Sequence, residues 1–393
     1  MPLDLRDLHI VDVDAHITEP HDLWTRNAPA AYVDRVPHVV EIDGIAQWVV
    51  DDVPIGRAMG ASVIKPDGVK QPGFEFITWG VEDIAVASYD MEARVEVLDE
   101  LGIYAQILYP NTAGFGAQRF GDVVDPELRR LCATLYNDAM VEIQEASGGR
   151  LLPMALMPWW DRDASIAEVG RAAANGLRGV NMCSDPHLRG AADLGEAAWD
   201  PFWAACAEHD MPVNFHIGAS DTSMTWFGTS SWPSHDDERK LAIGSAMMYL
   251  SNARILANLV FSGVLERFPT VKCVSVESGI GWIPFFLESL DYQLYESAPG
   301  IGDELSMLPS EYFRRQVYGC FWFENTSLEP VIEVLGADNV LFETDYPHPT
   351  CLYPDPLPRA AEAVAGLDDT VVRKIMQDNA AALYRIDLPV TVR

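Results

Sequence analysis

The segment His9–His16 reads HIVDVDAH, an apolar run that ends in two polar side chains. Asp14 and His16 are two positions apart, so in a β-strand both side chains point to the same face. The apolar residues before them fall on both faces, which is typical of a strand buried on both sides in a parallel sheet. The segment therefore predicts a buried parallel strand that presents an Asp-x-His pair at its carboxyl end.

Seven further segments share this buried-strand character: Tyr104–Pro110, Leu151–Pro158, Gly179–Cys183, Pro212–Gly218, Val271–Ser278, Gln316–Glu324 and Asn339–Pro347. Amphipathic helical patterns separate them, for example Val95, Leu98 and Leu101 after Asp90. The other helical patterns begin after Asp163 and lie at Phe202–Glu208, Arg254–Arg267, Ile283–Leu294, Glu329–Leu335 and Val371–Leu383. Eight strands that alternate with helices predict an α/β fold of the (β/α)8 TIM-barrel type. A doubly wound open sheet is the alternative.

Two stretches interrupt the alternation, at about residues 25–89 and 219–250. In the first, Val39–Ile42 and Gln47–Val50 around Asp43-Gly44 predict a hairpin. The second is rich in Ser, Thr, Trp and Gly, and loops of this length in a compact domain are often lids. Since no internal repeat or low-complexity linker is present, residues 1–393 are expected to form one domain with these two insertions.

The composition excludes some classes of function. The 393 residues carry 27 Lys plus Arg against 59 Asp plus Glu, a net charge of −32, without the basic clusters that nucleic acids require. No apolar run is long enough for a membrane span.

The six cysteines are scattered without a C-x-x-C pair, as in proteins of a reducing compartment, so we expect a cytoplasmic location. The expected partners are a small-molecule substrate and a second copy in a homodimer.

Four side chains with ligand character lie at the carboxyl ends of three predicted strands. Asp14 and His16 end the first, His216 the fifth and Asp345 the eighth. In a barrel these ends converge, and two imidazoles with two carboxylates suit a divalent first-row ion that keeps an open position for water. We expect Zn²⁺, with Mn²⁺ or Fe²⁺ as alternatives and either one or two ions. Each residue taken alone would more often be structural.

Three further polar residues lie close to these positions. Glu277, at the end of the sixth strand, could ligate a second metal ion, bind the metal-bound water, contact substrate or form a salt bridge at the rim. His348 could orient Asp345, touch substrate or be a plain turn histidine. Asp12 lies deeper in the first strand, where we expect a hydrogen-bonded supporting role.

Aromatic side chains are frequent near the predicted strand ends and in the second insertion. Trp159, Trp226 and Trp282 are the expected substrate-binding residues, although many tryptophans must belong to the core. The segment Gly114–Arg119 (GFGAQR) follows a strand, but Arg119 stands where a dinucleotide fingerprint needs its third glycine. This segment is therefore expected to be a flexible loop. No G-x-S-x-G nucleophile motif occurs.

Six segments spread over almost the whole chain carry a family resemblance: Val11–Pro20 (VDVDAHITEP), Phe215–Gly218 (FHIG), Ser262–Pro269 (SGVLERFP), Glu277–Trp282 (ESGIGW), Thr344–His348 (TDYPH) and Asn379–Tyr384 (NAAALY). In this order they resemble the amidohydrolase-related (amidohydrolase-2) family, which contains aminocarboxymuconate-semialdehyde decarboxylase.

The resemblance implies a distorted TIM barrel with a metal ion held by Asp14, His16, His216 and Asp345. It also implies that Asp345 acts as an acid/base. The sequence departs from the family pattern at two positions. The decarboxylases usually end their sixth strand in His, whereas this chain has Glu277. The aminocarboxymuconate-semialdehyde enzyme has His-x-His where this chain has Asp14-x-His16.

Both departures place negative charge where an imidazole would stand, and this argues against an anionic substrate unless a second cation neutralises it. Metal-assisted hydrolysis of an ester, thioester, lactone or amide bond is therefore the expected reaction. Asp345, Glu277 and His348 are the expected catalytic residues. Non-oxidative decarboxylation of a hydroxylated aromatic or unsaturated carboxylate is the alternative. A non-catalytic binding protein is a third possibility.

Overall fold

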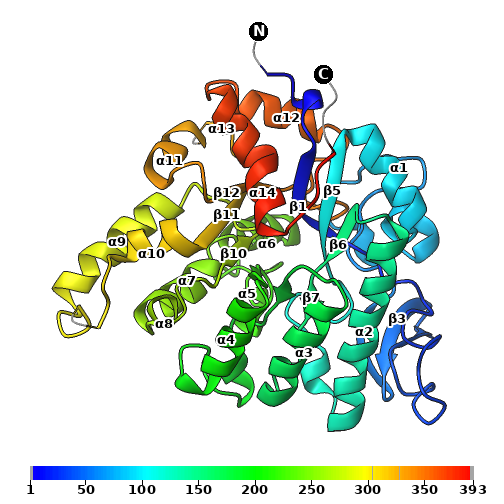
Figure 1. The fold of residues 1–393 in the computed structure, drawn as a ribbon. Helices are drawn as coiled ribbons and strands as arrows, with labels where there is room; N and C mark the ends of the chain where they lie inside the picture. Colours follow the sequence, from blue (N-terminus) through cyan, green and yellow to red (C-terminus); the bar gives the residue numbers. More distant parts are fainter. Residues whose placement is uncertain (1–2, 303, 327, 390–393) are drawn as a thin grey trace.

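The strands lie at the centre of the molecule, with most helices around their outside, in a computed structural model that describes residues 3–302, 304–326 and 328–389 (Figure 1). Every strand predicted from the sequence has a counterpart. These strands are β1 (Ile10–His16), β5 (Ile103–Tyr109), β6 (Leu151–Pro153), β7 (Ala155–Leu156), β8 (Val180–Asn181), β9 (Val213–His216), β10 (Cys273–Val276), β11 (Val317–Phe321) and β12 (Val340–Phe342).

All neighbouring strands of this set pair in parallel, in the orders β1-β5-β6 and β12-β11-β10-β9-β8-β7. Only Met154 separates β6 from β7, so these two short strands are nearly continuous and connect the two sheets. Beyond β12 the chain returns to β1, where the amide of Asp345 donates to Asp14 O at 2.8 Å and that of His16 to Tyr346 O at 2.7 Å. The carboxyl ends of β1 and β12 therefore lie side by side.

Helices follow the strands in alternation. They are α1 (Met91–Leu101), α2 (Pro126–Ala146), α3 (Arg162–Ala174), α4 (Asp200–Glu208), α5 (Asp221–Met224), α6 (Asp237–Met248), α7 (Asn252–Phe261), α8 (Val264–Arg267), α9 (Ile283–Glu296), α10 (Pro309–Gln316), α11 (Leu328–Leu335), α12 (Pro356–Ala363), α13 (Asp369–Arg373) and α14 (Asn379–Leu383). Short 3-10 helices lie at Leu5–Asp7, Glu75–Thr78, Val81–Asp83, Val86–Ser88, Phe120–Asp122, Pro186–Arg189 and Ala197–Trp199, and a π-helix at Lys374–Asp378 joins α13 to α14.

Local sequence explains where several helices begin and end. The Asp90 side chain caps α1 by accepting from the amide of Ala93 at 2.9 Å. The helical pattern at residues 254–267 is split into α7 and α8, because Gly263 between them takes a positive φ of 73°. The 21-residue helix α2 was not among the predicted helices.

The two insertions contain regular structure. In the first, β2 (His38–Ile42) and β3 (Ile45–Val50) pair antiparallel through a turn at Asp43-Gly44, with φ of 53° and 79°. A further antiparallel strand, β4 (Val53–Arg57), was not predicted. Helices α5 and α6 occupy the second insertion.

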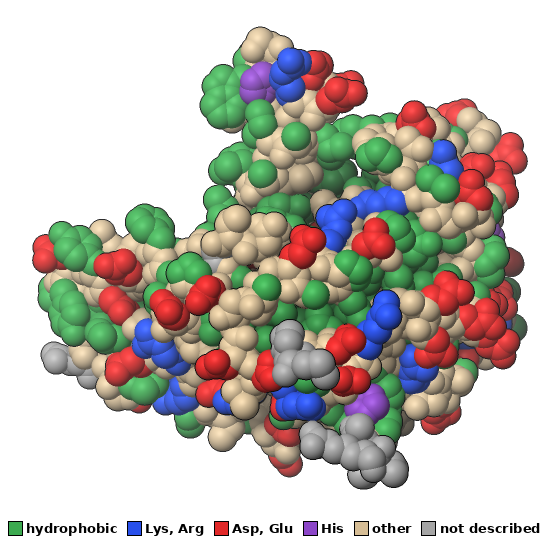
Figure 2. Space-filling model, turned by 90° about the horizontal axis from the view of Figure 1, so that it is seen from above, with side chains coloured by type: hydrophobic (Ala, Val, Ile, Leu, Met, Phe, Trp, Pro, Cys, Tyr) green, Lys and Arg blue, Asp and Glu red, His purple; other side chains and the backbone are tan. Residues whose placement is uncertain are grey.

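Acidic side chains are spread over the face shown in Figure 2 and are interspersed with apolar and basic ones. All six cysteines are buried and free. Within the described ranges, no helix is both long and apolar enough to cross a membrane.

Candidate metal centre

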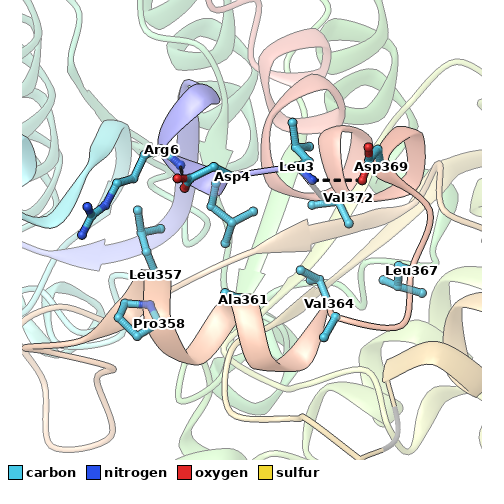
Figure 3. A pocket seen from close by; sticks show the side chains of 12 residues that line it. Leu3, Asp4, Arg6, Leu357, Pro358, Ala361, Val364, Leu367, Asp369 and Val372 are labelled. Atoms are coloured by element: carbon cyan, nitrogen blue, oxygen red, sulfur yellow. Dashed lines mark hydrogen bonds between the residues drawn. The ribbon is translucent and has the colours of Figure 1, made fainter. Parts of the chain in front are cut away.

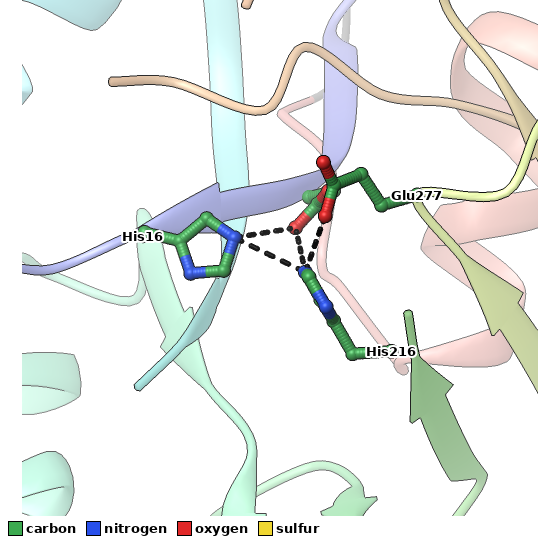
Figure 4. A group of neighbouring side chains, drawn as sticks. His16, His216 and Glu277 are labelled. Atoms are coloured by element: carbon green, nitrogen blue, oxygen red, sulfur yellow. Dashed lines mark hydrogen bonds and ion pairs between the residues drawn. The ribbon is translucent and has the colours of Figure 1, made fainter. Parts of the chain in front are cut away.

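Four buried side chains converge where β1, β9 and β10 end. Asp14, His16, His216 and Glu277 each offer one ligand atom, and these atoms all lie within 4.8 Å of one another. Figure 4 shows that His16, His216 and Glu277 point toward a common centre. A second group, formed by His16, Asp345 and His348, shares His16 with the first. The structure thus brings together all the residues that the sequence singled out as metal-ligating.

The nitrogen and oxygen atoms at this centre lie within 3.5 Å of their nearest partners in the cluster. The Nε2 atoms of His16 and His216 are 3.1 Å apart. Asp14 Oδ1 lies 3.5 Å from the first of these atoms and 3.3 Å from the second. Glu277 Oε2 is 3.4 Å from His216 Nε2, and Asp345 Oδ1 is 3.5 Å from His16 Nε2.

Two of these acidic residues have an unusual backbone conformation. Glu277 and Asp345 have positive φ values of 54° and 59°, which cost of order 1–3 kcal/mol for residues other than glycine. Hydrogen bonds hold both in place: the Glu277 amide donates to Glu343 Oε2 at 3.1 Å, and the Asp345 amide donates to Asp14 O at 2.8 Å. Strained residues of this kind concentrate at functional sites.

Burial sets the protonation of the cluster. It raises the pKa of Asp14 and of Glu277 well above ordinary carboxyl values, and the nearby Asp345 carboxylate adds to both shifts. Burial lowers the pKa of His16, and it lowers that of His216 to about 4. Both imidazoles are therefore neutral near pH 7, the form in which histidine binds metal ions.

The tautomer of His216 follows from its backbone contact. Its Nδ1 lies 2.6 Å from Ile217 O, and because a carbonyl oxygen only accepts, Nδ1 carries the proton. The lone pair of Nε2 then faces the cluster. Both Asp14 carboxylate oxygens are buried without a hydrogen-bond donor in the structure. Neutral imidazoles beside unsatisfied buried carboxylates are the donor set that a divalent cation requires, so these residues fit such an ion.

A second set of contacts surrounds the Asp345 carboxylate. Its Oδ1 lies 3.1 Å from His348 Nδ1, and its Oδ2 accepts a hydrogen bond from Thr350. On the other side of the imidazole, His348 Nε2 lies 2.7 Å from Asn111 Oδ1. Since an amide oxygen only accepts, this Nε2 carries a proton and Nδ1 faces Asp345. His348 thus contacts Asp345 directly and is not an isolated turn residue, and its catalytic role stays a prediction.

Asp12 has the supporting role expected of it. Its carboxylate accepts from the Thr344 amide at 2.8 Å, the Thr344 hydroxyl at 2.6 Å and Gln106 Nε2 at 2.8 Å. Burial raises its pKa to about 7 against the opposing effect of these hydrogen bonds. Asp12 therefore ties β1 to the end of β12 beneath the cluster. The buried Arg94 holds the same strand by donating to His16 O at 2.8 Å.

The three tryptophans expected to bind substrate occupy different environments. Trp159 is buried and donates from Nε1 to Gly116 O at 2.8 Å. Trp226 is half-buried in the second insertion. Trp282, also half-buried, donates to Ser278 O at 2.8 Å and packs against Phe286. Their contact with substrate stays a prediction.

Sequence reasoning missed several residues that line this centre. Asn111 directly follows the second predicted strand, so the signal that identified Asp14 and His216 was present for it too. Thr350 donates to Asp345 and lies 3.4 Å from Glu277 Oε1, but nothing in its sequence context indicates this position. Tyr249 comes from the second insertion. Burial, with the Glu277 and Asp345 carboxylates nearby, raises its pKa.

Two cavities differ in their relation to the cluster. One of about 470 Å³ lies near the amino end of β1, the opposite end from His16, and has a largely apolar lining that includes Leu3, Leu357 and Val372 (Figure 3). Catalysis is not expected at the amino ends of parallel strands, where packing serves stability. Another of about 210 Å³ adjoins the cluster through Asn111 and Phe115. Its lining includes none of the three expected tryptophans.

A family model described as amidohydrolase matches residues 11–386. Among characterised relatives, the gamma-resorcylate decarboxylase of Polaromonas sp. (strain JS666 / ATCC BAA-500) is 23% identical over 275 residues, which are 65% of this chain and 76% of the relative.

Solved structures share the fold. An amidohydrolase from Mycobacterium avium subsp. paratuberculosis K-10 superposes with a TM-score of 0.72 at 21% identity, covering 98% of this chain and 99% of that one. For 5-carboxyvanillate decarboxylase from Sphingomonas paucimobilis the TM-score is 0.64 at 19% identity, over 97% and 100% of the two chains. Dihydroxybenzoic acid decarboxylase from Polaromonas sp. JS666, solved with manganese and 2-nitroresorcinol, gives 0.63 at 17% identity over 97% and 98%.

These relatives correct the expected reaction: the prediction of hydrolysis is wrong, because the relatives with a named reaction are decarboxylases. Hydrolysis was expected because Asp14 and Glu277 would place negative charge beside the substrate. Burial raises the pKa of both carboxyls and thereby weakens that argument. A divalent metal ion is supported, whereas the expected zinc receives no support from a relative that binds manganese.

Proposed function

The chain belongs to the amidohydrolase family, and we propose that it is a divalent-metal-dependent decarboxylase of hydroxylated aromatic carboxylates. The observation that carries this proposal is the convergence of neutral imidazoles and buried carboxylates at the ends of β1, β9, β10 and β12. The named decarboxylases among its relatives supply the reaction class.

We assign the metal ion to Asp14, His16, His216 and Asp345, with Glu277 at the β10 side of the cluster. Manganese is favoured over zinc because carboxylate oxygens make up half or more of this donor set and oxygen donors suit Mn²⁺. The manganese in the dihydroxybenzoic acid decarboxylase supports this choice. When bound, a divalent ion would supply positive charge that attracts the anionic substrate.

The protein's own residues supply the proton. The Asp345 carboxyl and His348 Nδ1, 3.1 Å apart, hold one proton between them, and Asn111 keeps His348 in the tautomer that faces Asp345. In the proposed step the bond between the ring carbon and the carboxylate breaks and its electron pair remains on the ring carbon. Asp345 delivers the proton to that carbon, and CO₂ leaves. A proton from water then returns to the pair of Asp345 and His348, so each turnover consumes one solvent proton and needs no oxidant.

Glu277 and Thr350 complete the acidic side of the centre. Thr350 donates to Asp345 Oδ2 and lies between that residue and Glu277, so it fixes which Asp345 oxygen faces His348. The strained backbone of Glu277, held by Glu343, keeps its carboxylate beside His216. We therefore place Glu277 with the ligands rather than at the rim.

The wider organisation belongs to the same proposal. The hydrogen bonds from the β12 end to β1 and the continuous path from β6 to β7 support a closed, distorted (β/α)8 barrel. A single domain over residues 1–393, a homodimer and a cytoplasmic location stay predictions.

The proposal is tested by loading chelator-treated protein with Mn²⁺ and measuring CO₂ release from 2,6-dihydroxybenzoate and 5-carboxyvanillate. We expect CO₂ from at least one acid in the reloaded protein and none in the chelated protein. His216→Ala should abolish release. His235→Ala, which changes a histidine of the second insertion that contacts Ser230, should not.

A further inference from the structure

The segment Gly114–Arg119, expected to be a flexible loop, is held firmly in the structure. Gln118 Nε2 donates to Gly218 O at 2.6 Å, and its Oε1 accepts from the Gly116 amide at 2.8 Å. Asn181 donates to Phe115 O at 2.5 Å, and Trp159 donates to Gly116 O at 2.8 Å. Bonds from β8, from the loop after β9 and from the loop after β7 thus fix this backbone, which is the behaviour of a binding loop rather than a linker.

This backbone presents the Phe115 ring to the three histidines of the candidate metal centre. Its centroid lies 5.0 Å from that of His16, 4.5 Å from that of His216 and 5.8 Å from that of His348. A side chain on Gly218 would meet the ring, because a Cβ there would lie 2.7 Å from Phe115 Cδ2. Phe115 is therefore closely packed on its metal-facing side.

The cavity of about 210 Å³ lies beside the same loop. Its lining consists of Asn111, Gly114, Phe115, Gln118, Arg119, Asp221 and Met224. A cavity of about 150 Å³ suffices to hold benzene, so this volume accepts one substituted aromatic ring. Asn111 connects the cavity to the proton-holding pair, because its Oδ1 lies 2.7 Å from His348 Nε2.

The two charged residues that line this cavity differ in their partners. Asp221 is paired with Arg189, whose Nε and Nη2 donate to its two carboxylate oxygens at 2.6 and 2.9 Å, and the same guanidinium also pairs with Asp122. Arg119 is exposed, and among residues 3–302, 304–326 and 328–389 no carboxylate lies within salt-bridge distance of it. The Arg119 guanidinium is therefore available to an anion beside an aromatic wall.

We propose that this cavity is an outer substrate subsite, in which Arg119 binds the anionic group of an aromatic carboxylate and Phe115 contacts its ring. The inference rests on the proposed function for the identity of the substrate. The subsite adds Arg119 as the residue that attracts this substrate, and it gives the route by which the substrate approaches Asn111 and His348.

A charge of this sign matters because the protein as a whole repels its proposed substrate. The chain carries a net charge of −32, and such a field lowers the local concentration of anions and slows their association. A guanidinium at the mouth of a cavity reverses this effect locally and pairs with a carboxylate through two parallel hydrogen bonds. Its contribution should weaken as salt screens the charge.

The test compares Arg119→Gln with Arg6→Gln in manganese-loaded protein. Arg6 is also exposed, but it lines the cavity at the opposite end of β1, so it is a control of equal charge. The probes are benzoate and the neutral benzamide, neither of which carries the hydroxyl needed for reaction, and calorimetry measures their dissociation constants. We expect Arg119→Gln to weaken benzoate binding about tenfold, or roughly 1.4 kcal/mol, without affecting benzamide. Arg6→Gln should change neither.

Equal benzoate binding by Arg119→Gln and the wild type would overturn the proposal, as would an equal loss of benzamide. Phe115→Leu should weaken both probes, and unchanged binding of both would remove the ring contact from the account. Arg119→Lys, which keeps the charge but not the paired donors, should recover part of the benzoate affinity.

These outcomes stand apart from the proposed function. If the wild type releases CO₂ from a hydroxybenzoate but Arg119→Gln leaves benzoate binding unchanged, only the subsite fails. If no acid is decarboxylated but Arg119→Gln loses benzoate selectively, the subsite stands and the reaction is wrong.

Discussion

The Nε2 atoms of His16 and His216 lie 3.1 Å apart in the buried centre. His216 carries its proton on Nδ1, so its Nε2 lone pair points at the other ring. Two neutral imidazoles, with an Asp14 oxygen 3.3 to 3.5 Å from both nitrogens, place three donor atoms around one point at which a divalent cation can bind. This arrangement links the fold to metal-dependent chemistry.

Removal of either a nitrogen or an oxygen donor should remove the metal ion. We expect His216→Ala and Asp14→Ala to lower Mn²⁺ affinity by at least about 100-fold, because even groups that only support ligands contribute 10- to 100-fold. Metal content after gel filtration, measured by mass spectrometry, checks this. His235→Ala is the control, and equal metal content in all four proteins would contradict the assignment.

Asp345→Asn should lower kcat by about 10²- to 10⁴-fold, because the amide has no acidic proton to give. His348→Gln should lower kcat less, since it removes the group that faces Asp345 but leaves the carboxyl in place. Steady-state rates on a decarboxylated acid, with metal content measured in parallel, test both. A kcat of Asp345→Asn within twofold of wild type would remove this residue from the proton transfer.

Stability should depend on metal more strongly at high pH. Burial and the neighbouring carboxylates raise the pKa of Asp14 and Glu277 above ordinary values of 3.8 and 4.5. Without metal, these two carboxyls bind more protons in the folded protein than in the unfolded chain above about pH 4, so their contribution to stability falls as pH rises. A bound cation stabilises the ionised carboxylates and removes this loss.

We therefore expect Mn²⁺ to raise Tm by at least about 2 °C more at pH 8 than at pH 5.5, measured by scanning calorimetry. A larger rise at pH 5.5 would show that these carboxylates are not the groups that hold the ion.

Asp12→Ala should destabilise the protein without touching the metal ligands directly. It would leave the Thr344 amide and hydroxyl and the Gln106 amide buried without an acceptor, at about 1–3 kcal/mol for each lost partner. We expect the free energy of unfolding to fall by at least about 3 kcal/mol in urea titrations. The exposed Asp7→Ala should stay within about 0.5 kcal/mol, and an equally small change for Asp12→Ala would refute its supporting role.

Much of the fold could be predicted because buried parallel strands have a simple signature. The run before Asp14 and His16 and the run before Asp345 are both apolar on two faces, and β1 and β12 form where expected. The positions of the candidate ligands followed, since the carboxyl ends of such strands meet. Glu277 was found by the same logic, although its role was left open.

The remainder depends on contacts that periodicity does not encode. Thr350 reaches Asp345 only because the chain turns back after β12, and Phe115 reaches the histidines because residues far along the chain hold its loop. The reaction could not be inferred from the acidic residues either. Burial raises the pKa of Asp14 and Glu277, and the sequence alone does not show this change in their charge.

The most direct test of the account follows 2,6-dihydroxybenzoate labelled with ¹³C at its carboxylate, incubated with manganese-loaded protein in D₂O. The account predicts ¹³CO₂ and an equal amount of resorcinol carrying one deuteron at the carbon that bore the carboxylate. Both products should disappear in chelated protein and in Asp345→Asn. No labelled CO₂ from this acid or from 5-carboxyvanillate, or an undiminished rate after chelation, would contradict metal-dependent decarboxylation.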